Sequence, residues 1–405
     1  MSLNVIVGQS GGPTCVINSS LAGVYKAAKS LGIENVYGML HGIKGLLNNE
    51  YVNLDEKLKS SINIDLLKRT PASFLGSCRF KLPDYSEDES IYENIFKKLN
   101  ELSIGYFFYI GGNDSMDTIK KLSGYAEKIK SSIKFLGVPK TIDNDLALTD
   151  HTPGFGSAAK YIATTLKELV CDCRIYDCEA VTIVEIMGRN AGWLTASAAL
   201  VKSEDCEGVD MIFLPEKTFD VDFFMQRVKE IIQKKKYCVV AISEGIKLSD
   251  GRFVCSLASE NTTTDAFGHK MMSGSAKYLE TLIKDTLHIK ARAIEISTLQ
   301  RCASHFASLT DIEEAFNCGE AAVYNAIVNK MTGKVICMKR ESNVPYKISY
   351  ETSDVNEIAN VEKTVPSEWI TKDYVTEDVI RYIRPLIQGE LNPIMNEGLP
   401  RQIKL

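Results

Sequence analysis

The chain has 405 residues, of which 45% are hydrophobic and 24% are charged, and its formal net charge is −5. The length is enough for two hydrophobic cores, and the composition is that of a globular protein. No apolar run is long enough to span a membrane and no Lys/Arg block is long enough for a nucleic-acid tract, so we expect neither kind of partner.

The eleven cysteines indicate a reducing compartment. Their number is odd, no CxxC pattern occurs, and the start of the chain lacks the features of a secretory signal. Cys171, Cys173 and Cys178 cluster, but no His lies near them and their spacing fits no zinc pattern. We therefore expect reduced thiols and a cytoplasmic location.

Apolar, β-rich runs alternate with helix-like segments along the chain, and the first helix is expected to extend through Lys29. Nearly continuous apolar strands of this kind favour parallel sheets that are covered on both faces. The expected class is therefore α/β, and ligands of such folds bind at the carboxyl ends of the strands. The predicted strands are residues 3–8, 106–110, 133–138, 180–186 and 237–242.

The turn after the first predicted strand contains Gly11 and Gly12 just before a helix. Glycine lets backbone N–H groups approach an anion, and a helix N-terminus adds partial positive charge, so the turn could cradle a phosphate. Residues 8–12 also read GxSxG, which opens a hydrolase alternative with Ser10 as nucleophile and His305 as base. The first strand of the chain is the wrong place for that nucleophile elbow.

The turn after the second predicted strand reads Gly111-Gly112-Asn113-Asp114-Ser115. Helix capping by one polar residue, worth about 1 kcal/mol, is an ordinary explanation for part of it. Capping does not explain the paired glycines.

Residues 140–145 (KTIDND) form the turn with the strongest signal. Asp143 and Asp145 are carboxylates two residues apart at a strand end, and Lys140 precedes them. A hydroxyl that accepts a phosphoryl group needs a carboxylate to take its proton, and the phosphates need Mg²⁺ and cations. An Asx-turn would account for one of the two aspartates only.

Later turns add groups that suit a sugar phosphate. Arg189 follows Met187 and Gly188, and Glu244 lies between Ser243 and Gly245. Arg292 and Arg301 add positive charge further along. Any one of these side chains, taken alone, is more often part of a surface salt bridge.

Together these turns resemble the phosphofructokinase family. The resemblance runs in register from Gly11 to about Arg301, through SGGPT, FLGSCR, GGNDS, PKTIDND, MGRNAGW, SEG and LQR. It implies two Rossmann-like three-layer α/β/α domains with mostly parallel sheets. It also implies transfer of a phosphoryl group to the 1-hydroxyl of fructose 6-phosphate with Mg²⁺ as the cofactor.

The resemblance assigns roles to residues that match the family's motifs. Asp143 would be the general base, assisted by Lys140 and Asp114. The acceptor sugar phosphate would be bound by Thr141, Ile142, Asp143, Met187, Gly188, Arg189, Glu244, Arg292 and Arg301. The donor would be bound by Gly11, Gly12, Arg79, Gly112 and Ser115, and the metal by Asn113 and Asp145.

Two positions indicate the phosphoryl donor. Members of the family that use ATP have Gly where this chain has Asp114 and Lys140. A carboxylate at 114 would repel the α-phosphate of a nucleotide, and two like charges about 4 Å apart cost on the order of 1 to 4 kcal/mol. The resemblance is therefore to the pyrophosphate-dependent branch, with pyrophosphate as donor and the reaction reversible.

The chain departs from the family's pattern at three positions. Asn113 replaces the usual Asp, Ala180 lies where an Arg from a neighbouring subunit is common, and Thr298 replaces a His. The family builds its sugar-phosphate site across a subunit interface, so we expect a homodimer or homotetramer with Arg292 donated between subunits.

The domain organisation expected from the resemblance has three segments. Residues 1–150 would bind pyrophosphate and Mg²⁺, residues 151–290 would bind fructose 6-phosphate, and residues 291–405 would return to complete both domains. The more polar residues 341–375 predict an irregular or appended region. Two alternatives stay open: an ATP-dependent 6-phosphofructokinase, and a non-catalytic regulatory subunit of the same fold.

Overall fold

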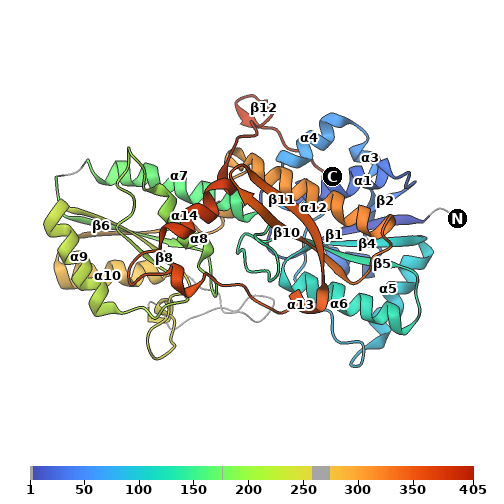
Figure 1. Cartoon of the computed structure of the whole chain (residues 1–405), viewed down its shortest axis with the longest axis horizontal. Coiled ribbons are helices and arrows are strands. Elements are labelled where there is room, and N and C mark those ends of the chain that lie inside the picture. Colours follow the sequence, from blue (N-terminus) through green and yellow to red (C-terminus); the bar gives the residue numbers. More distant parts are fainter. Residues whose placement is uncertain (1–2, 176, 258–273) are drawn as a thin grey trace. The chain divides into compact units, whose positions relative to one another are not determined.

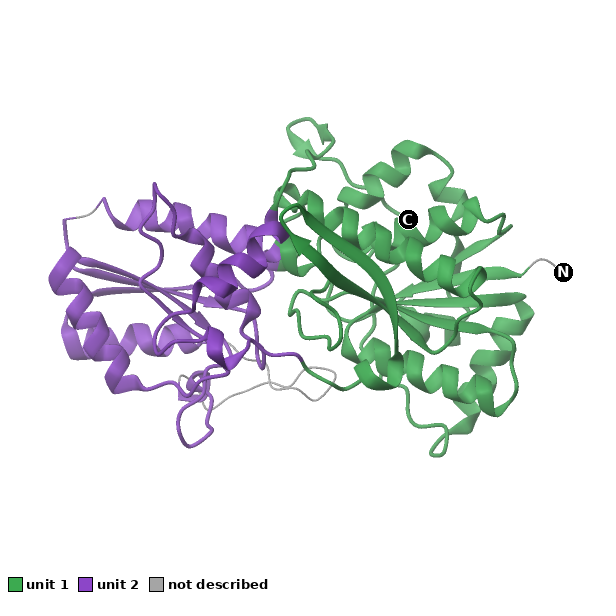
Figure 2. Ribbon diagram, viewed as in Figure 1, with its two compact units in different colours: residues 1–157, 301–362, 388–405 green, residues 158–300, 363–387 purple. Residues whose placement is uncertain are grey.

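The computed structural model describes residues 3–175, 177–257 and 274–405. The chain forms two compact units, each assembled from segments that are distant in sequence (Figures 1 and 2). Unit 1 consists of Met1–Ser157, Arg301–Glu362 and Gln388–Leu405, and unit 2 of Ala158–Gln300 and Lys363–Ile387.

Within the described residues, unit 1 is built on a seven-stranded sheet with the strand order β11-β10-β5-β4-β1-β2-β3. The strands from β10 to β2 run parallel, and β11 and β3 pair antiparallel at the two edges. The carboxyl ends of the parallel strands therefore meet at one edge of the sheet. The strands are β1 (Asn4–Gln9), β2 (Val36–Met39), β3 (Tyr51–Asn53), β4 (Ile104–Gly111), β5 (Lys134–Pro139), β10 (Lys334–Asn343) and β11 (Tyr346–Asp354).

Alternate residues of the central strands enter two separate cores, one on each face of this sheet. In β4, Phe108 and Ile110 pack with α1 and α12, whereas Phe107 and Tyr109 pack with α5 and α6. All four are buried, and each such side chain contributes roughly 1.5–3 kcal/mol of burial free energy. The helices of unit 1 are α1 (Ile17–Ser30), α2 (Gly42–Leu47), α3 (Asp55–Leu58), α4 (Ser61–Arg69), α5 (Glu89–Glu101), α6 (Asn113–Lys128), α12 (Leu309–Ile327) and α13 (Val355–Ile358).

Unit 2 is a smaller sheet with the order β7-β8-β6-β9, all parallel. Its strands are β6 (Ala180–Ile186), β7 (Met211–Phe213), β8 (Tyr237–Ser243) and β9 (Lys290–Glu295). Its helices are α8 (Trp193–Ala196), α9 (Val221–Lys235), α10 (Ser275–Leu287) and α14 (Glu377–Ile383), with the 3₁₀ turns Ser197–Val201, Val254–Leu257, Ser367–Trp369 and Arg384–Ile387.

A few elements lie at the unit boundaries or outside the main sheets. Helices α7 (Phe155–Cys173) and α11 (Leu299–Cys302) cross from one unit to the other along the sequence. The 3₁₀ turn Ser304–Phe306 precedes α12, and near the C-terminus β12 (Met395–Asn396) pairs with β13 (Leu399–Pro400).

The α/β class and the parallel sheets are confirmed, and all five predicted strands are present within one or two residues of their expected ends. The prediction of an irregular region at residues 341–375 was wrong for its first part. Strand β10 continues through Asn343, and β11 forms the sheet edge. No side chain of this edge strand is fully buried, so β11 lacks the apolar run that marks a central strand.

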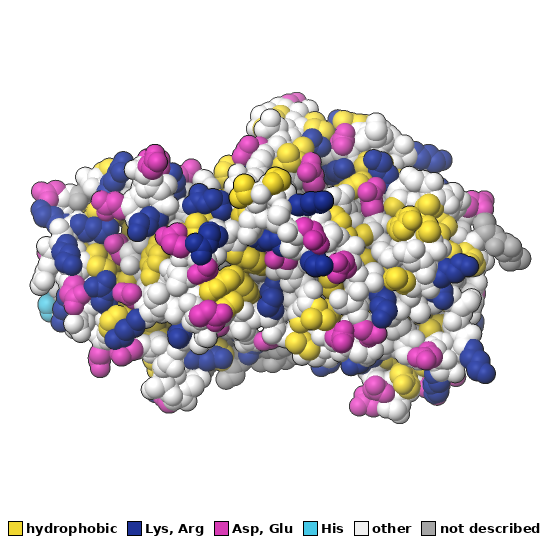
Figure 3. All heavy atoms as spheres, in the orientation of Figure 1, with side chains coloured by type: hydrophobic (Ala, Val, Ile, Leu, Met, Phe, Trp, Pro, Cys, Tyr) yellow, Lys and Arg dark blue, Asp and Glu magenta, His cyan; other side chains and the backbone are white. Residues whose placement is uncertain are grey.

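The surface carries both signs of charge. On the face shown in Figure 3, Lys and Arg side chains are interspersed with Asp and Glu. Among the described residues, every helix is too short or too polar to cross a bilayer. All eleven cysteines are free thiols, and the Cys173 sulfur lies 3.3 Å from the Thr182 hydroxyl.

Candidate functional site

Lys140 links two of the predicted turns of unit 1. It follows β5, and its Nζ donates a 2.7 Å hydrogen bond to the carbonyl oxygen of Gly12, in the turn after β1. The same Nζ lies 3.4 Å from where a Cβ would stand on Gly11, whose φ of +76° favours glycine. Arg301 Nη1 lies 3.3 Å from the corresponding position on Gly12. The structure thus brings two cations to the paired glycines.

The base candidate Asp143 lies in the electrostatic field of these cations. Its carboxylate accepts a 3.3 Å hydrogen bond from the Thr141 hydroxyl, which in turn accepts one from the Asp143 N–H at 3.1 Å. Burial raises the pKa of Asp143, while Lys140, Thr141 and Arg301 oppose that rise. A carboxylate with a raised pKa is a better proton acceptor, which suits a general base.

The same burial acts in the opposite direction on the cations. It lowers the pKa of Lys140 to about 8, although the carboxylates of Asp143 and Asp145 favour its charged form. Burial also lowers the pKa of Arg301, and the nearby charge of Arg79 lowers it further. Arg79 itself is exposed. Water would screen the positive charges of this cluster only weakly, so they would attract an entering phosphate strongly.

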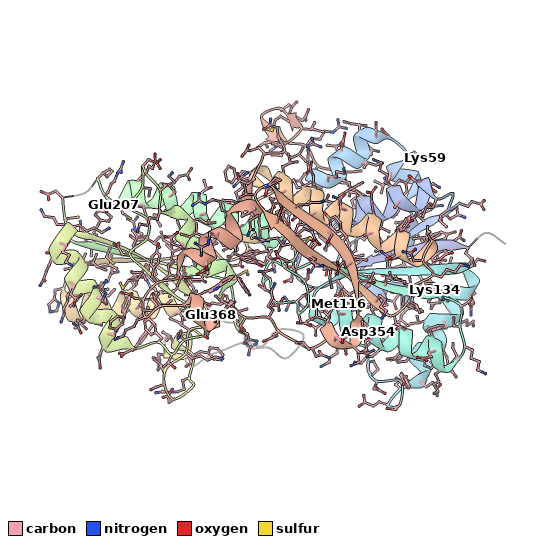
Figure 4. All side chains as sticks on the ribbon, viewed as in Figure 1. Lys59, Met116, Lys134, Glu207, Asp354 and Glu368 are labelled. Atoms are coloured by element: carbon pink, nitrogen blue, oxygen red, sulfur yellow. The ribbon has the colours of Figure 1, made fainter. Side chains whose placement is uncertain are left out.

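The second predicted turn begins helix α6, and tight packing fixes it beside the third. A Cβ on Gly111 would lie 1.8 Å from the Ser115 hydroxyl oxygen, so only glycine fits at position 111 beside Ser115. The Gly111 carbonyl accepts the Lys140 N–H at 3.0 Å. Met116, labelled in Figure 4, lies on α6 with its sulfur 2.5 Å from the Cβ position of Gly137 in β5. Close approach of α6 and β5 therefore brings the two turns together.

Within this turn, Gly112 is the residue before the helix and Asp114 lies exposed in its first turn. An acidic group there is stabilised by the helix dipole. The Asn113 side chain makes two hydrogen bonds: its Oδ1 accepts from the Asn360 N–H at 3.1 Å, and its Nδ2 donates to the Val361 carbonyl at 3.3 Å. Only an amide can make both bonds, which explains Asn in place of Asp.

The first glycine turn also makes hydrogen bonds to other parts of the chain. The Gly11 N–H donates to the Cys78 carbonyl at 3.3 Å, and the Ser77 hydroxyl donates to the Gly11 carbonyl at 2.6 Å. These bonds fix Arg79, the next residue, beside the turn. The Gly11 N–H would have to leave Cys78 before it could bind a phosphate.

The predicted acceptor residues of unit 2 lie where β6 and β8 end side by side. The Gly188 N–H donates to Glu244 Oε1 at 3.3 Å, and the Ser243 hydroxyl donates to the Gly188 carbonyl. Gly188 has a φ of +136°, and a Cβ on Gly245 would lie 1.9 Å from the Arg189 carbonyl oxygen. Glycines thus allow the two loops to lie against each other.

Arg189 and Arg292 occupy different places in unit 2. The Arg189 guanidinium lies 5.9 Å from the centre of the Phe253 ring, near the loops. Arg292 is exposed on β9 and in register with Thr182, five residues before Met187. At about 3.3 Å per residue this is roughly 16 Å along the sheet. Within one chain, therefore, Arg292 does not join the loops of unit 2.

Sequence analysis did not indicate one charged group near the base candidate. Glu362 forms a backbone bridge with Leu146, and its charge opposes ionisation of Asp143. It comes from far along the chain, so no local pattern could indicate it. Ser10, proposed in the hydrolase alternative, is buried, whereas His305 is exposed in the 3₁₀ turn Ser304–Phe306.

The metal candidates offer a sparse set of ligands. In the part of the chain that the structure describes, no three His, Cys, Asp or Glu side chains converge as a protein cage would require. Mg²⁺ commonly takes one or two carboxylates together with substrate phosphates and water. Asp145, beside Lys140, fits that mode, and the Asn113 oxygen keeps a second lone pair.

Comparison with known proteins gives one family. The phosphofructokinase family model matches residues 4–326. Proteins named pyrophosphate–fructose 6-phosphate 1-phosphotransferase from Methylococcus capsulatus and Halomonas elongata are each 39% identical over 99% of this chain and 96% of their own length. The crystal structure of a pyrophosphate-dependent phosphofructokinase from Nitrosospira multiformis is 35% identical, with a TM-score of 0.89 over 100% of this chain and 96% of that one. The chain therefore belongs to the phosphofructokinase family.

Proposed function

We propose that this chain transfers a phosphoryl group from pyrophosphate to the 1-hydroxyl of fructose 6-phosphate, giving fructose 1,6-bisphosphate and phosphate in a reversible step of glycolysis. The observation that carries the proposal is the buried Lys140, which donates to the Gly12 carbonyl and interacts electrostatically with the carboxylate of Asp143. The names of the similar proteins give the same reaction.

Asp143 is the group that takes the proton. As the sugar 1-hydroxyl attacks phosphorus, its proton passes to the Asp143 carboxylate, whose raised pKa makes it a competent acceptor. Lys140 stabilises the negative charge of the transferring group, and Arg79 and Arg301 add to the same field. The remaining donor contacts are assigned to Gly11, Gly12, Gly112 and Ser115.

Asp114 decides between pyrophosphate and ATP. It lies in the first turn of α6, where the partial positive charge of the helix N-terminus attracts the distal phosphate of the donor. The resemblance places Gly at 114 and 140 in members that use ATP. The Asp114 carboxylate repels a third phosphate, while Lys140 neutralises the two that pyrophosphate has.

The acceptor contacts are assigned to two sets of residues in this proposal. Met187, Gly188, Arg189 and Glu244 are assigned to the sugar phosphate from unit 2, and Thr141, Ile142, Asp143 and Arg301 from unit 1. Arg292 lies away from the loops of its own chain, which supports its donation to a neighbouring subunit. We therefore propose a homodimer or homotetramer that acts in the cytoplasm.

Mg²⁺ would be held by Asp145 and the oxygen of Asn113, with pyrophosphate completing its coordination. When bound, it neutralises phosphate charge and orients the donor. The Asn113 side chain also holds residues 360–361, so its contribution to the ion is limited to the remaining lone pair.

The test is direct assay of the products. Purified protein is incubated with fructose 6-phosphate, Mg²⁺ and pyrophosphate, and phosphorus NMR follows the reaction. We expect one phosphate and one fructose 1,6-bisphosphate for each pyrophosphate consumed, and the reverse reaction when the products are supplied. Turnover with ATP but not with pyrophosphate would establish the ATP-dependent kinase instead, and no turnover with either would favour a regulatory subunit.

A further inference from the structure

A buried histidine lies on the segment that follows the base loop. His151 is 1% exposed, and its ring nitrogens are 2.8 Å from Asp150 Oδ1 and 2.7 Å from Glu314 Oε2. Ionised carboxylates only accept hydrogen bonds, so a ring between two of them must donate from both nitrogens. The geometry therefore calls for an imidazolium. Burial alone would lower the pKa of His151, but the two carboxylates outweigh burial and raise it to about 9.

Further groups complete the charge balance around this histidine. Arg340 donates to Asp150 Oδ1 from Nη2 at 2.7 Å and from Nε at 3.1 Å. The Tyr346 hydroxyl donates to Glu314 Oε1 at 2.7 Å. Two cations thus face two carboxylates, which is the condition for tolerating buried charge. The cluster ties the segment at 150–151 to β10, β11 and α12.

Asp311 holds the next part of the same segment and adds charge near Glu314. Its two oxygens accept the N–H groups of Gly154 at 2.8 Å and Ser157 at 2.9 Å. Burial raises the pKa of Asp311 to about 6, and the charge of Glu314 adds to the rise. Residues 150–157 are therefore fixed at both ends.

The fixed segment in turn holds both flanks of the base. The Thr152 hydroxyl donates to the Thr141 carbonyl at 2.8 Å, and the Thr152 N–H donates to Asn144 Oδ1 at 3.1 Å. The Thr141 N–H donates to the Pro153 carbonyl at 3.2 Å. Asn144 is fully buried with a φ of +56°, a conformation that needs support from its surroundings. Asp143 is thus held between two residues that Thr152 contacts.

We propose that His151 is a positioning residue for phosphoryl transfer: held between Asp150 and Glu314, it fixes residues 150–154, and Thr152 transmits that placement to Asp143. The inference rests on the proposed function, because it assigns a catalytic consequence to the cluster around His151. A misplacement of about 1 Å in a reacting group costs roughly 10²-fold in rate, so a small shift of this segment is enough to matter.

The test compares variants by kcat, by KM for pyrophosphate and by recovery of kcat in a conservative variant. His151→Gln removes the imidazolium, Thr152→Val removes the hydroxyl bond to Thr141, and Thr152→Ser retains that bond. Ser19→Ala is the matched control, because the Ser19 hydroxyl makes an equally buried 2.7 Å bond to the Ile312 carbonyl outside the loop. Each variant is assayed well below its melting temperature, after wild-type turnover with pyrophosphate has been established.

We expect His151→Gln and Thr152→Val to lower kcat by roughly 10- to 100-fold, with KM for pyrophosphate within about twofold of wild type. Thr152→Ser should recover most of the rate, and Ser19→Ala should change melting temperature only.

Wild-type kcat in the His151 and Thr152 variants would overturn the inference, even if their melting temperatures fall. If His151→Gln does not fold, the Thr152 pair decides by the same criteria. Absence of wild-type turnover with pyrophosphate would overturn the proposed function and this inference with it. Normal wild-type turnover beside unaffected variants would overturn the inference alone.

Discussion

The turns of unit 1 and the loops of unit 2 are built on different physical principles. In unit 1, Lys140 and Asp143 are ionisable groups whose pKa values burial shifts toward neutrality. In unit 2, glycines at 188 and 245 let two loops pack closely, and Glu244 holds a backbone N–H. Electrostatics therefore dominates in the turns of unit 1, and close steric packing dominates in the loops of unit 2. This difference is expected if unit 1 carries out proton and phosphoryl transfer and unit 2 recognises the shape of the acceptor.

Removing the base should have the largest effect. Asp143→Ser leaves no carboxylate to take the hydroxyl proton, so kcat should fall by about 10² to 10⁴. Binding of fructose 6-phosphate, measured by calorimetry, should stay within severalfold of wild type. Near-normal kcat would mean that another group accepts the proton.

A steric change in unit 2 should act on binding instead. Gly245→Ala places a Cβ 1.9 Å from the Arg189 carbonyl oxygen, so the loops must separate. We expect KM for fructose 6-phosphate to rise by roughly tenfold or more, which corresponds to about 1.4 kcal/mol. Gly251→Ala, where an added Cβ would meet nothing within 4 Å but the φ is +83°, controls for local strain. Equal KM values for the two variants would contradict the steric account.

The pH profile should report the tuned pair of unit 1. Lys140 loses its charge as pH rises through about 8, so kcat/KM should fall about tenfold per pH unit above that value. Asp143 must be ionised, and its raised pKa should place the acidic limb above the range of ordinary carboxylates. Lys140→Arg keeps its charge throughout and should lack the alkaline limb. An unchanged alkaline limb in that variant would assign it to another group.

The buried cluster of unit 1 should also affect the free energy of unfolding. The folded pKa of His151, about 9, exceeds the value of 6.5 for an ordinary histidine. Its stabilising contribution is therefore complete below pH 6.5 and is lost as pH rises through 9. His151→Gln should be less stable than wild type by on the order of 3 kcal/mol at pH 6. That gap, measured by denaturant titration, should narrow between pH 6.5 and 10, and a constant gap would show that His151 is neutral.

Features of these two regions could be predicted from the sequence where the residues that form them are contiguous, and not where folding brings distant residues together. Residues 140–145 and 187–189 were predicted as site residues because strand, turn and candidate side chain are contiguous there. His151 and Glu362 were missed because their roles depend on partners such as Glu314 and Leu146, which only folding brings near. The hydrogen bonds between Asn113 and residues 360–361 could not be predicted for the same reason. Strand β11 was missed because an edge strand lacks the apolar run of a central one.

The central claim is that Asp114 and Lys140 select pyrophosphate over ATP, and it is tested most directly by changing both. The ratio of kcat/KM for pyrophosphate to that for ATP is measured for wild type and for the double variant Asp114→Gly, Lys140→Gly. We predict a large ratio in the wild type and a fall of about 10²-fold or more in the double variant, since one stabilising cation and one repelling carboxylate are removed. A wild type that uses ATP as well as pyrophosphate, or a double variant whose ratio is unchanged, would contradict the account.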